Sequence, residues 1–562
     1  MKQTGSKIII EDYKNNFIYK KNETNLNIQF NRVAFIFFIF FIIYLIYTIH
    51  LIHLGTRSSK VDKTENIPVV IDKLYRADIL DINGNYLAKT VRSIDIGIKT
   101  SDVIDKKKLL LSLKIIFPNK DFSKIEKELN QKKYFYLEKK ISEENYEKIM
   151  KLGDKSIKPE EKVLRMYPQK NLFSHIIGQI DNDNQGISGI EKSFDDRLKK
   201  KKEPLKLTVD TDLQFLVREQ LIKFNTIFRS KGAAAILMNV NNGEIISMVS
   251  YPDFDLNKRE KIVDLDFINR ATKGVYELGS VFKTFTVAAG LDQNLIDVDT
   301  EFLDLPKSIR CAGQPIGEYS DNIPSDLTVE EILIRSGNIG SVRIGQKLEI
   351  DKLKSFLEKV GVLNKIDFDI EEVGEPYPFK WGKCKLATVS FGHGITTTPL
   401  QLAKGYSIIT NGGFDIKPTL IKRDEDNIEN KNRIIKKGIS EKLNLILRKI
   451  VTNKEGTAEL ANIDGYEVGG KTGTAQKTTL GGYSNLKVNT FASIFPTSKP
   501  KYALIVLLDE PKTNSEYIYY YKDGKQPTKG TPYNTAGWTS VEVAGNIIER
   551  IGPILATKHI EN

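Results

Sequence analysis

The sequence predicts a mixed α/β (α+β) fold in which residues 205–562 form one domain, with an antiparallel sheet and packed helices. Three observations predict it. The chain has 562 residues, more than one hydrophobic core usually supports, so two or more domains are expected. Apolar runs of strand length occur early and late in residues 205–562, with mostly helical patterns between them. A long apolar stretch near the N-terminus stands apart from these domains.

That apolar stretch, Val33–Leu54, has 22 residues and contains no Asp, Glu, Lys or Arg. At about 1.5 Å per residue, a helix of this length crosses the ~30 Å hydrocarbon layer of a membrane. A cleaved signal peptide is the alternative, but a polar segment of 32 residues precedes the run and no small-x-small cleavage site follows it. We therefore expect an uncleaved signal anchor. Lysines and arginines are balanced on its two sides, so charge alone does not orient it.

Residues 57–204 are predicted to form a separate N-terminal region of mixed α/β structure, opening with a polar linker over residues 57–75. Arg76–Ala88 resembles two short strands joined at Asn83-Gly84, a strong hairpin signal. Residues 105–160 are rich in Lys and Glu with helical spacing, and Ile190–Leu198 is predicted to be a short helix.

The domain over residues 205–562 opens with Leu207–Gln214, where a strand end leads into a helix capped by Asp210 or Thr211. An Asn-Asn-Gly turn after Val240 then marks a buried hairpin. Two later apolar runs complete the antiparallel sheet. The predicted strands are Ala233–Val240, Glu244–Ser250, Thr490–Phe495 and Tyr502–Leu508.

Composition argues against several functions. The net charge is +12, but Lys, Asn and Ile recur along the whole chain and no basic stripe with interleaved aromatics is present, so no nucleic-acid partner is expected. The two cysteines, Cys311 and Cys384, form no C-x-x-C pair, which disfavours a thiolate zinc site. They could form one disulfide in an oxidising compartment or be two small buried residues. With only five histidines, two of them in the apolar run, no metal site is expected.

The first of three short motifs is Ser280-Val-Phe-Lys283, preceded by Gly279, which permits a tight turn, and followed by residues that suit a buried helix. Positions i and i+3 share a helix face, so Lys283 can reach the Ser280 hydroxyl. A serine nucleophile needs an adjacent base, and lysine serves only if its pKa falls well below ~10.4. Two other S-x-x-K matches, Ser484–Lys487 and Ser498–Lys501, are interpreted as solvated turns.

The second motif is Ser336-Gly-Asn338, at a corner between two predicted helices. Thr328 and Glu331 form a T-x-x-E capping box for the helix before it. A corner of this kind can point a hydroxyl and an amide into a cleft. Ser320-Asp-Asn322 is a literal competitor, but it lies in a loop, where it is interpreted as an ordinary Asx turn.

The third motif is Lys471-Thr-Gly-Thr474, after Gly469-Gly470. Glycines leave one face of a strand bare, so a substrate backbone can approach and pair with it. Lys471 would supply a positive charge and Thr474 a hydroxyl. The alternative is a glycine-rich loop with an incidental lysine.

S-x-x-K, S-x-N and K-T-G in this order are typical of class A β-lactamases and penicillin-binding proteins. The sequence closely resembles the class B penicillin-binding proteins, and among them the division-type, FtsI-like branch. It departs from that branch at Ala77, Ile82 and Gly337, none of them a catalytic position. The further segments that carry the resemblance are Arg76–Ala88, Gln185–Phe194, Leu207–Gln214, Asn269-Arg270 and Phe391–Ala403.

This resemblance implies a catalytic role for four motif residues. Ser280 would attack the carbonyl of a D-Ala-D-Ala stem peptide and release the terminal D-Ala. Lys283 would take the serine proton. Ser336 would relay a proton, and Lys471 would keep Lys283 deprotonated.

The other motif residues would bind substrate. Asn338 would hold a substrate amide, and Thr474 would bind the carboxylate on a strand shared with Thr472 and Gly473. The backbone N–H groups of Ser280 and Thr474 would form the oxyanion hole. A second stem-peptide amine would then accept the acyl group, and β-lactams should acylate Ser280 as substrate mimics. No metal or organic cofactor would be needed.

The resemblance also implies an architecture and a location. Residues 205–562 would have the serine β-lactamase-like transpeptidase fold, and residues 57–204 would be an elongated pedestal of the dimerisation type. Residues 33–54 would cross the inner membrane, with residues 1–32 cytoplasmic and residues 57–562 periplasmic. Because no glycosyltransferase domain fits, the protein would depend on a SEDS-family glycosyltransferase and other divisome membrane proteins.

Three alternatives stand beside a division-type transpeptidase. An elongation-type enzyme would have the same chemistry, although the spacing around Gln185–Phe194 favours the division type. A β-lactamase is disfavoured by the anchor and the large N-terminal region. A non-catalytic β-lactam sensor would carry several membrane spans, and a degenerate scaffold would have lost a motif residue. His393, in a Gly-His-Gly turn, is interpreted as a structural histidine rather than a cleft residue.

Overall fold

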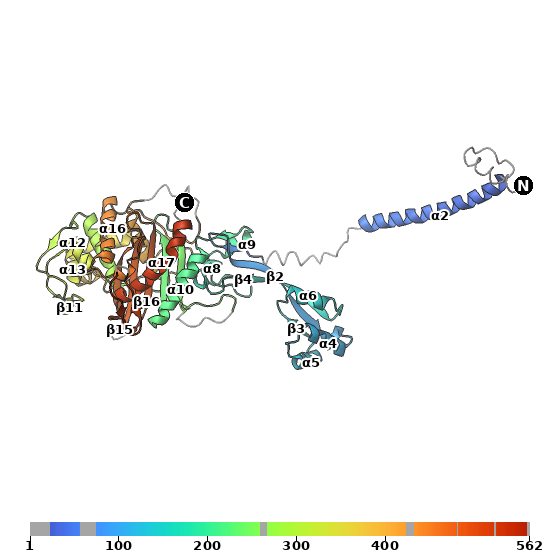
Figure 1. The fold of residues 1–562 in the computed structure, drawn as a ribbon, viewed down its shortest axis with the longest axis horizontal. Coiled ribbons are helices and arrows are strands. Elements are labelled where there is room, and N and C mark those ends of the chain that lie inside the picture. Colours follow the sequence, from blue (N-terminus) through green and yellow to red (C-terminus); the bar gives the residue numbers. More distant parts are fainter. Residues whose placement is uncertain are drawn as a thin grey trace. The chain divides into compact units, whose positions relative to one another are not determined.

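The computed structural model describes residues 23–56, 75–258, 267–422, 432–479, 482–521 and 524–558. The chain divides into two units, Met1–Lys73 and Leu74–Asn562 (Figure 1). The predicted linker, apart from residue 75, and residues 1–22 of the predicted tail lie outside the described residues.

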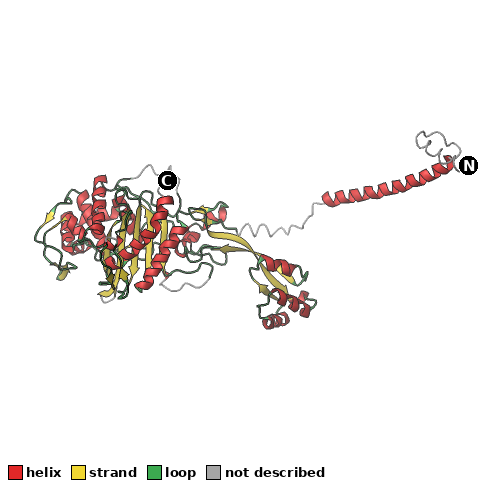
Figure 2. Cartoon of the chain, viewed as in Figure 1, coloured by secondary structure: helices red, strands yellow, loops and turns green. Residues whose placement is uncertain are grey.

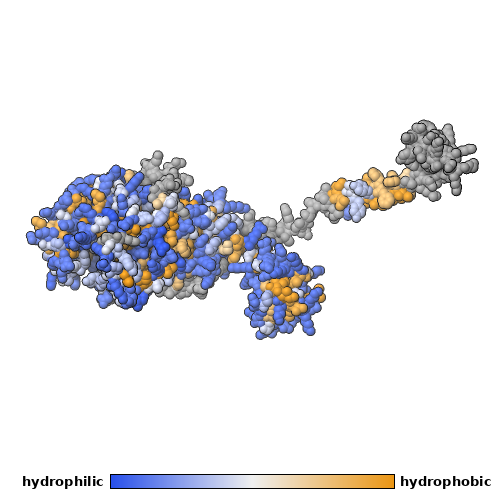
Figure 3. All heavy atoms as spheres, viewed as in Figure 1, coloured by the Kyte–Doolittle hydropathy of each residue, from blue (hydrophilic) through white to orange (hydrophobic). Residues whose placement is uncertain are grey.

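The described residues of the first unit form the long helix α2 (Glu23–Thr56), which begins ten residues before the predicted span. Within it, Ala34–Ile52 has a mean hydropathy of 2.6 and is long and apolar enough to cross a membrane. None of that segment is buried against the rest of the chain, and its apolar side chains form the orange band in Figure 3. A helix of this length and composition matches the thickness and polarity of the hydrocarbon layer of a membrane.

The N-terminal part of the second unit is built on a five-stranded sheet in the order β3-β2-β1-β5, with β4 paired to β2. The predicted turn at Asn83-Gly84 is confirmed, because the Asp81 carboxylate accepts the backbone N–H groups of Asn83 and Asn85, and Gly84 has a φ of 88°. The strands are β1 (Ile79–Leu80), β2 (Tyr86–Lys99), β3 (Tyr134–Glu138), β4 (Ile157–Met166) and β5 (Leu205–Lys206).

Helices α4, α5 and α6 confirm the helical prediction for residues 105–160, and they pack with β2 and β3 around a small core of their own. Strand β3 was not predicted, because five residues between charged helices carry too little pattern. The predicted helix Ile190–Leu198 is two short helices that meet at Phe194. The helices here are α4 (Lys106–Ile116), α5 (Phe122–Gln131), α6 (Glu143–Met150), α7 (Ser174–Ile177), α8 (Gly189–Ser193) and α9 (Asp195–Lys200).

A buried ion cluster joins the residue Arg76, ahead of β1, and Arg165 in β4 to helix α8. Glu191 in α8 accepts bonds from the guanidinium groups of both Arg76 and Arg165, and all three side chains are almost fully buried. Arg76 also pairs with Asp195 at 2.6 Å. Burial by itself would lower the pKa of Arg76, but the ion pairs with Glu191 and Asp195 outweigh it and raise the pKa above its usual value.

The larger part of the second unit contains a five-stranded antiparallel sheet in the order β14-β15-β16-β6-β7 (Figure 2, yellow). All four predicted strands are present, and early strands pair with late ones, as predicted. The central β16 is buried along its whole length, which identifies a sheet covered on both faces. The strands are β6 (Gly232–Asn239), β7 (Ile245–Tyr251), β14 (Gly469–Thr479), β15 (Gly482–Phe495) and β16 (Tyr502–Asp509).

Helices α10 and α17 pack together against one face of this sheet, and α15 and α16 pack on the other. The Asp210 carboxylate accepts the N–H groups of Asp212 and Leu213 and caps α10, so the prediction of Asp210 as cap is correct. The helices are α10 (Thr211–Ile227), α11 (Lys283–Asp292), α12 (Val329–Ile334), α13 (Asn338–Lys359), α14 (Lys383–Val389), α15 (Pro399–Thr410), α16 (Lys437–Thr452) and α17 (Ser540–Lys558).

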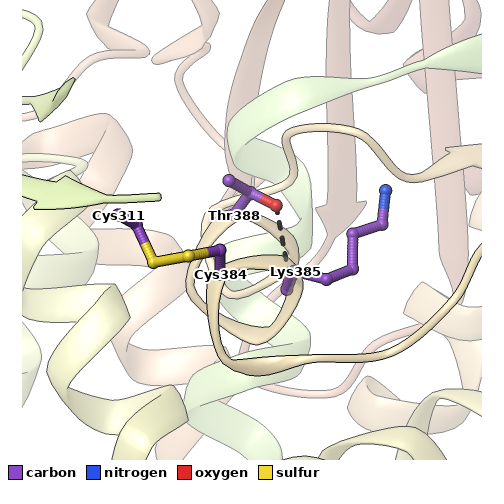
Figure 4. Close-up of a disulfide and its surroundings, with 4 residues drawn as sticks. All are labelled: Cys311, Cys384, Lys385 and Thr388. Atoms are coloured by element: carbon purple, nitrogen blue, oxygen red, sulfur yellow. Dashed lines mark hydrogen bonds between the residues drawn. A yellow bond between two sulfur atoms is a disulfide. The ribbon is translucent and has the colours of Figure 1, made fainter. Parts of the chain in front are cut away.

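Among the described residues, four two-stranded ladders lie outside the main sheet, and none of them was predicted. Cys311 ends the first strand of one hairpin and is bonded to Cys384 in α14, 73 residues away in the sequence (Figure 4). Of the two possibilities left open for the cysteines, the structure shows the disulfide. The ladders are β8 (Tyr276–Glu277) with β13 (Thr396–Thr397), β9 (Glu301–Phe302) with β12 (Leu327–Thr328), β10 (Ser308–Cys311) with β11 (Gln314–Gly317), and β17 (Ile518–Tyr519) with β18 (Thr528–Lys529).

Candidate active site

Ser280 lies in a short 3-10 helix, η3 (Gly279–Phe282), that runs directly into α11. Gly279 has a φ of 65°, a left-handed conformation that glycine adopts without strain, so the tight turn expected from the sequence is present. The Ser280 side chain is half-buried, and its hydroxyl makes no hydrogen bond to any other described residue. The serine therefore stands at a helix start with its hydroxyl available to a reactant.

Lys283 is the first residue of α11, and its side chain is fully buried. Its amine donates to the backbone carbonyl of Ser336, to the Ser336 hydroxyl at 3.2 Å and to Asn338 Oδ1 at 2.7 Å. The Lys283 amine thus joins the first motif to the second, although Lys283 and Ser336 are 53 residues apart in the sequence.

Ser336 follows α12 in a left-handed conformation, with a φ of 60°. Its N–H donates to Leu333 O and the N–H of Gly337 donates to Ile332 O, which is the Schellman arrangement that ends a helix. Glycine usually occupies the left-handed position of this motif, but here Gly337 has a φ of −63° and the serine takes the strained place. The two backbone hydrogen bonds hold Ser336 in this strained conformation at the corner between α12 and α13.

Lys471, in β14, reaches the same hydroxyl from the opposite side, with Nζ 2.8 Å from Ser336 Oγ. Its side chain is also fully buried. Burial lowers the pKa of Lys283 to about 7, and burial together with repulsion from Lys283 lowers the pKa of Lys471 well below its usual value. Each ammonium therefore disfavours the other, so the two amines are harder to charge together than singly.

Strand β14 lies directly against the turn that carries Ser280. A Cβ on Gly473 would stand 2.0 Å from the carbonyl oxygen of Leu278, so only glycine allows this approach. A Cβ on Gly279 would stand 3.2 Å from the backbone nitrogen of Thr474. The backbones of Thr474 and of the residue before Ser280 are therefore neighbours, which brings the two predicted oxyanion donors together.

The hydroxyls of β14 have defined partners. Thr474 Oγ1 accepts the N–H of Ala536 at 2.9 Å, which leaves its own O–H to be donated to an anion. Thr472 Oγ1 lies 2.7 Å from Thr457 Oγ1 and is nearly buried. Thr472 thus bonds to Thr457 and also accepts from Lys471 Nζ at 3.5 Å, whereas Thr474 is half-buried in the middle of the strand.

Asn338 is the first residue of α13, and its amide is held from both ends. Its Nδ2 donates to Gly317 O at 2.8 Å and its Oδ1 accepts from Lys283. The Glu318 carboxylate accepts the backbone N–H groups of Asn338 and Ile339. No role for Glu318 was predicted from the sequence, because no pattern near this residue indicates that its carboxylate lies at the start of α13.

The competing matches lie elsewhere. Ser320 accepts the N–H of Asn322 within its own turn, as an isolated turn would. Ser484 donates to Lys477 O at the far end of the β14–β15 pair, and Ser498 lies in an exposed turn. None of these hydroxyls bonds to Lys283 or Lys471, whereas the Ser336 hydroxyl bonds to both lysines. Ser280 stands three residues before Lys283 in the continuous segment of η3 and α11.

His393 lies between two aromatic rings, with centroid distances of 5.8 Å to Phe391 and 4.6 Å to Tyr483. Burial lowers its pKa, and Glu277 acts in the opposite direction. Glu277 stands three residues before Ser280 and accepts the N–H of Gly394 at 3.0 Å. In the part of the chain that the structure describes, no cluster of His, Cys, Asp or Glu could hold a metal ion.

A serine at a helix start, a buried lysine one turn later, a second hydroxyl between two amines and a glycine-bearing strand define an acyl-transfer enzyme with a serine nucleophile. Comparison with protein families agrees with this class. Residues 233–528 match the penicillin binding protein transpeptidase domain, and residues 72–221 match the penicillin-binding protein dimerisation domain.

Three similar proteins illustrate the relationship. Over 497 residues, 86% of this chain and 82% of the relative, the chain is 30% identical to the probable peptidoglycan D,D-transpeptidase FtsI of Caulobacter vibrioides. It is 28% identical over 539 residues (87% and 79%) to stage V sporulation protein D of Bacillus subtilis. It is 27% identical over 416 residues (68% and 69%) to peptidoglycan D,D-transpeptidase FtsI of Escherichia coli. The chain belongs to the class B penicillin-binding proteins, in their FtsI-like group, and is a transpeptidase of that class.

Proposed function

We propose that this protein cross-links peptidoglycan stem peptides through an acyl-enzyme on Ser280 during cell division. One observation carries the chemistry: Ser336 Oγ lies 2.8 Å from the amine of Lys471 and 3.2 Å from that of Lys283. Protons can pass between the two amines through this hydroxyl, and Lys283 is one helical turn from Ser280. Both amines have pKa values lowered by burial, so a neutral base exists near pH 7.

In the proposed reaction, Lys283 takes the proton of Ser280 as Oγ attacks the carbonyl carbon of the penultimate D-Ala. The N–H groups of Ser280 and Thr474 stabilise the oxyanion, and the proton passes through Ser336 to the amine of the departing D-Ala. A neutral amine of a second stem peptide then attacks the ester carbonyl and forms the cross-link, while the bond to Ser280 Oγ breaks and the proton of the amine returns to that oxygen. Asn338 would hold the substrate amide, and Thr474 would donate its hydroxyl to the terminal carboxylate, beside Thr472 and Gly473.

We place the protein in the inner membrane, with residues 33–54 as a single span, residues 1–32 in the cytoplasm and the rest in the periplasm. The apolar helix supports the span, and the disulfide between Cys311 and Cys384 supports an oxidising compartment. In this proposal residues 57–204 form a pedestal for the catalytic domain over residues 205–562. A SEDS-family glycosyltransferase and other divisome proteins would supply and organise the glycan strands.

Labelling with a fluorescent penicillin tests the chemistry. We expect one covalent adduct in the full-length chain, and none in the Ser280→Ala variant. Ser484→Ala and Ser498→Ala are matched controls, because each removes the serine of another S-x-x-K match and should label like the parent. An adduct that persists in Ser280→Ala would refute the nucleophile.

Depletion in cells tests the role in division. Two similar proteins are named FtsI, whereas a third is named for sporulation, so the class alone does not fix the role. Filamentous cells on depletion would support division, and round cells would show the elongation-type alternative. Wild-type shape and growth with intact penicillin labelling would favour a sensor or scaffold.

A further inference from the structure

The carboxylate of Glu318 forms the N-terminal cap of α13 although it lies twenty residues before that helix. The backbone N–H of Asn338 donates to Oε2 at 2.6 Å, and the N–H of Ile339 donates to Oε1 at 2.8 Å. The residue that precedes the helix, Gly337, has no side chain to cap it. Glu318 therefore satisfies the N–H groups that a helix start leaves without a partner.

The same short segment orients the Asn338 side chain. The carbonyl of Gly317 accepts from Nδ2 at 2.8 Å, which turns Oδ1 toward Lys283 at 2.7 Å. With its NH2 group held by a carbonyl, the amide cannot rotate without losing both bonds. Gly317 and Glu318, at the end of the β10–β11 hairpin, thus fix the backbone and the amide of Asn338 together.

Glu318 also acts on the charge of the buried amine. Lys283 faces the amine of Lys471 from β14, and the partial positive charge at the N-terminus of α13 lies beside it. Among the described residues, Glu318 is the one carboxylate whose charge acts on Lys283, and it favours the ammonium form. Burial and Glu318 therefore act on the pKa of Lys283 in opposite directions.

We propose that Glu318 is a positioning residue of this active site, which holds Asn338 in place against the amine of Lys283. The inference rests on the proposed function, because it concerns how fast Ser280 is acylated. Glu318 itself touches no reacting atom in this assignment. Its effect passes through the two residues that it orients and polarises.

The test is the pH dependence of acylation of the full-length chain by a fluorescent penicillin, with Glu318→Gln compared with the parent. Loss of the negative charge disfavours the ammonium of Lys283, so its neutral form should persist to lower pH. We expect the acidic limb of the rate profile to move to lower pH by on the order of one unit. The rate at the upper plateau should fall several-fold, because one of the two N–H groups of α13 loses its acceptor.

Glu331→Gln is the matched control. Glu331 caps the neighbouring helix α12 in its own capping box with Thr328 but does not act on Lys283. This variant should keep the acidic limb of the parent. Glu318→Asp, which retains the charge, should also keep it, even if the shorter side chain lowers the plateau. Thermal unfolding of each variant shows whether it is folded.

The outcomes separate the two proposals. A lower plateau with an unmoved acidic limb in folded Glu318→Gln would reduce Glu318 to a structural cap and overturn the inference. A shift of the acidic limb to lower pH in Glu331→Gln or in Glu318→Asp would overturn the inference as well. These two variants decide the matter if Glu318→Gln does not fold. Absence of labelling in the parent chain would instead refute the proposed function, and this inference with it.

Discussion

The amine of Lys471 donates to the hydroxyl of Ser336 across 2.8 Å, and the amine of Lys283 donates to the same oxygen. Two fully buried lysines that share one acceptor repel each other when both are charged. The hydroxyl between them gives a proton a path from one amine to the other. Burial lowers the pKa of both amines, and this is the basis of the proposal that Lys283 acts as a base near neutral pH.

The first prediction concerns pH. Because burial lowers the pKa of Lys283 to about 7, its neutral form is lost as the pH falls below that value. Acylation by a fluorescent penicillin should therefore rise with pH through about 7 and fall roughly tenfold for each unit below it. The second-order rate, measured over a range in which thermal unfolding shows the protein intact, checks this. A rate that stays constant through neutral pH would contradict it.

The second prediction concerns the strained serine. Ser336→Ala should lose acyl transfer, whereas Ser320→Ala should retain it, because the Ser336 hydroxyl bonds to both lysines and the Ser320 hydroxyl bonds within its own turn. Ser336→Gly should be equally inactive yet more stable than Ser336→Ala by about 1 kcal/mol, because glycine adopts a φ of 60° without strain. Turnover and denaturant unfolding measure both effects. An active Ser336→Ala would refute the relay.

Gly337 provides the matched control for that prediction. Its φ of −63° suits any residue, and an added Cβ would meet nothing closer than 3.7 Å. Gly337→Ser should therefore keep both activity and stability, because the left-handed position that favours glycine is that of Ser336 and not that of Gly337. A large loss of stability in this variant would show that the corner tolerates less change than its geometry indicates.

The third prediction concerns the disulfide. Cys311 and Cys384 close a loop with a sequence separation of 73, and the loss of such a cross-link costs up to roughly 4 kcal/mol in the chain-entropy model. The Cys311→Ser/Cys384→Ser variant should be less stable and acylated more slowly, because the freed hairpin carries Gly317 and Glu318. A reductant should affect the parent in the same direction and leave the double variant unchanged. Equal effects of reductant on both proteins would exclude this disulfide as the cause.

The fourth prediction concerns the buried ion cluster. Glu191→Gln should destabilise the protein by about 3–5 kcal/mol, because two buried guanidinium groups lose their shared counter-charge. Glu203→Gln, at an exposed carboxylate in the same region, should change stability by no more than about 0.5 kcal/mol. Denaturant unfolding measures both variants. Equal stability of the two would show that the cluster contributes little.

The sequence by itself determined the features that depend on local chemistry. The Asn83-Gly84 turn, the Thr328–Glu331 capping box and the apolar runs of β6, β7 and β16 each follow from neighbours within a few residues. The order of the three motifs and their family resemblance placed Ser280 and Lys283 in one site. Motif chemistry is short-range, so it can be recognised without knowing the fold.

Only the tertiary structure decided which distant groups meet. Ser336 and Ser320 both lie in plausible turns. Only the folded structure shows that the amines of two buried lysines bond to the Ser336 hydroxyl, whereas Ser320 bonds within its own turn. The pairing of Cys311 with Cys384 and the return of Glu318 to the start of α13 involve contacts 73 and 20 residues apart. The protonation of Lys283 likewise follows from burial and from charges on other elements. Such properties arise from packing between remote segments, which no local pattern records.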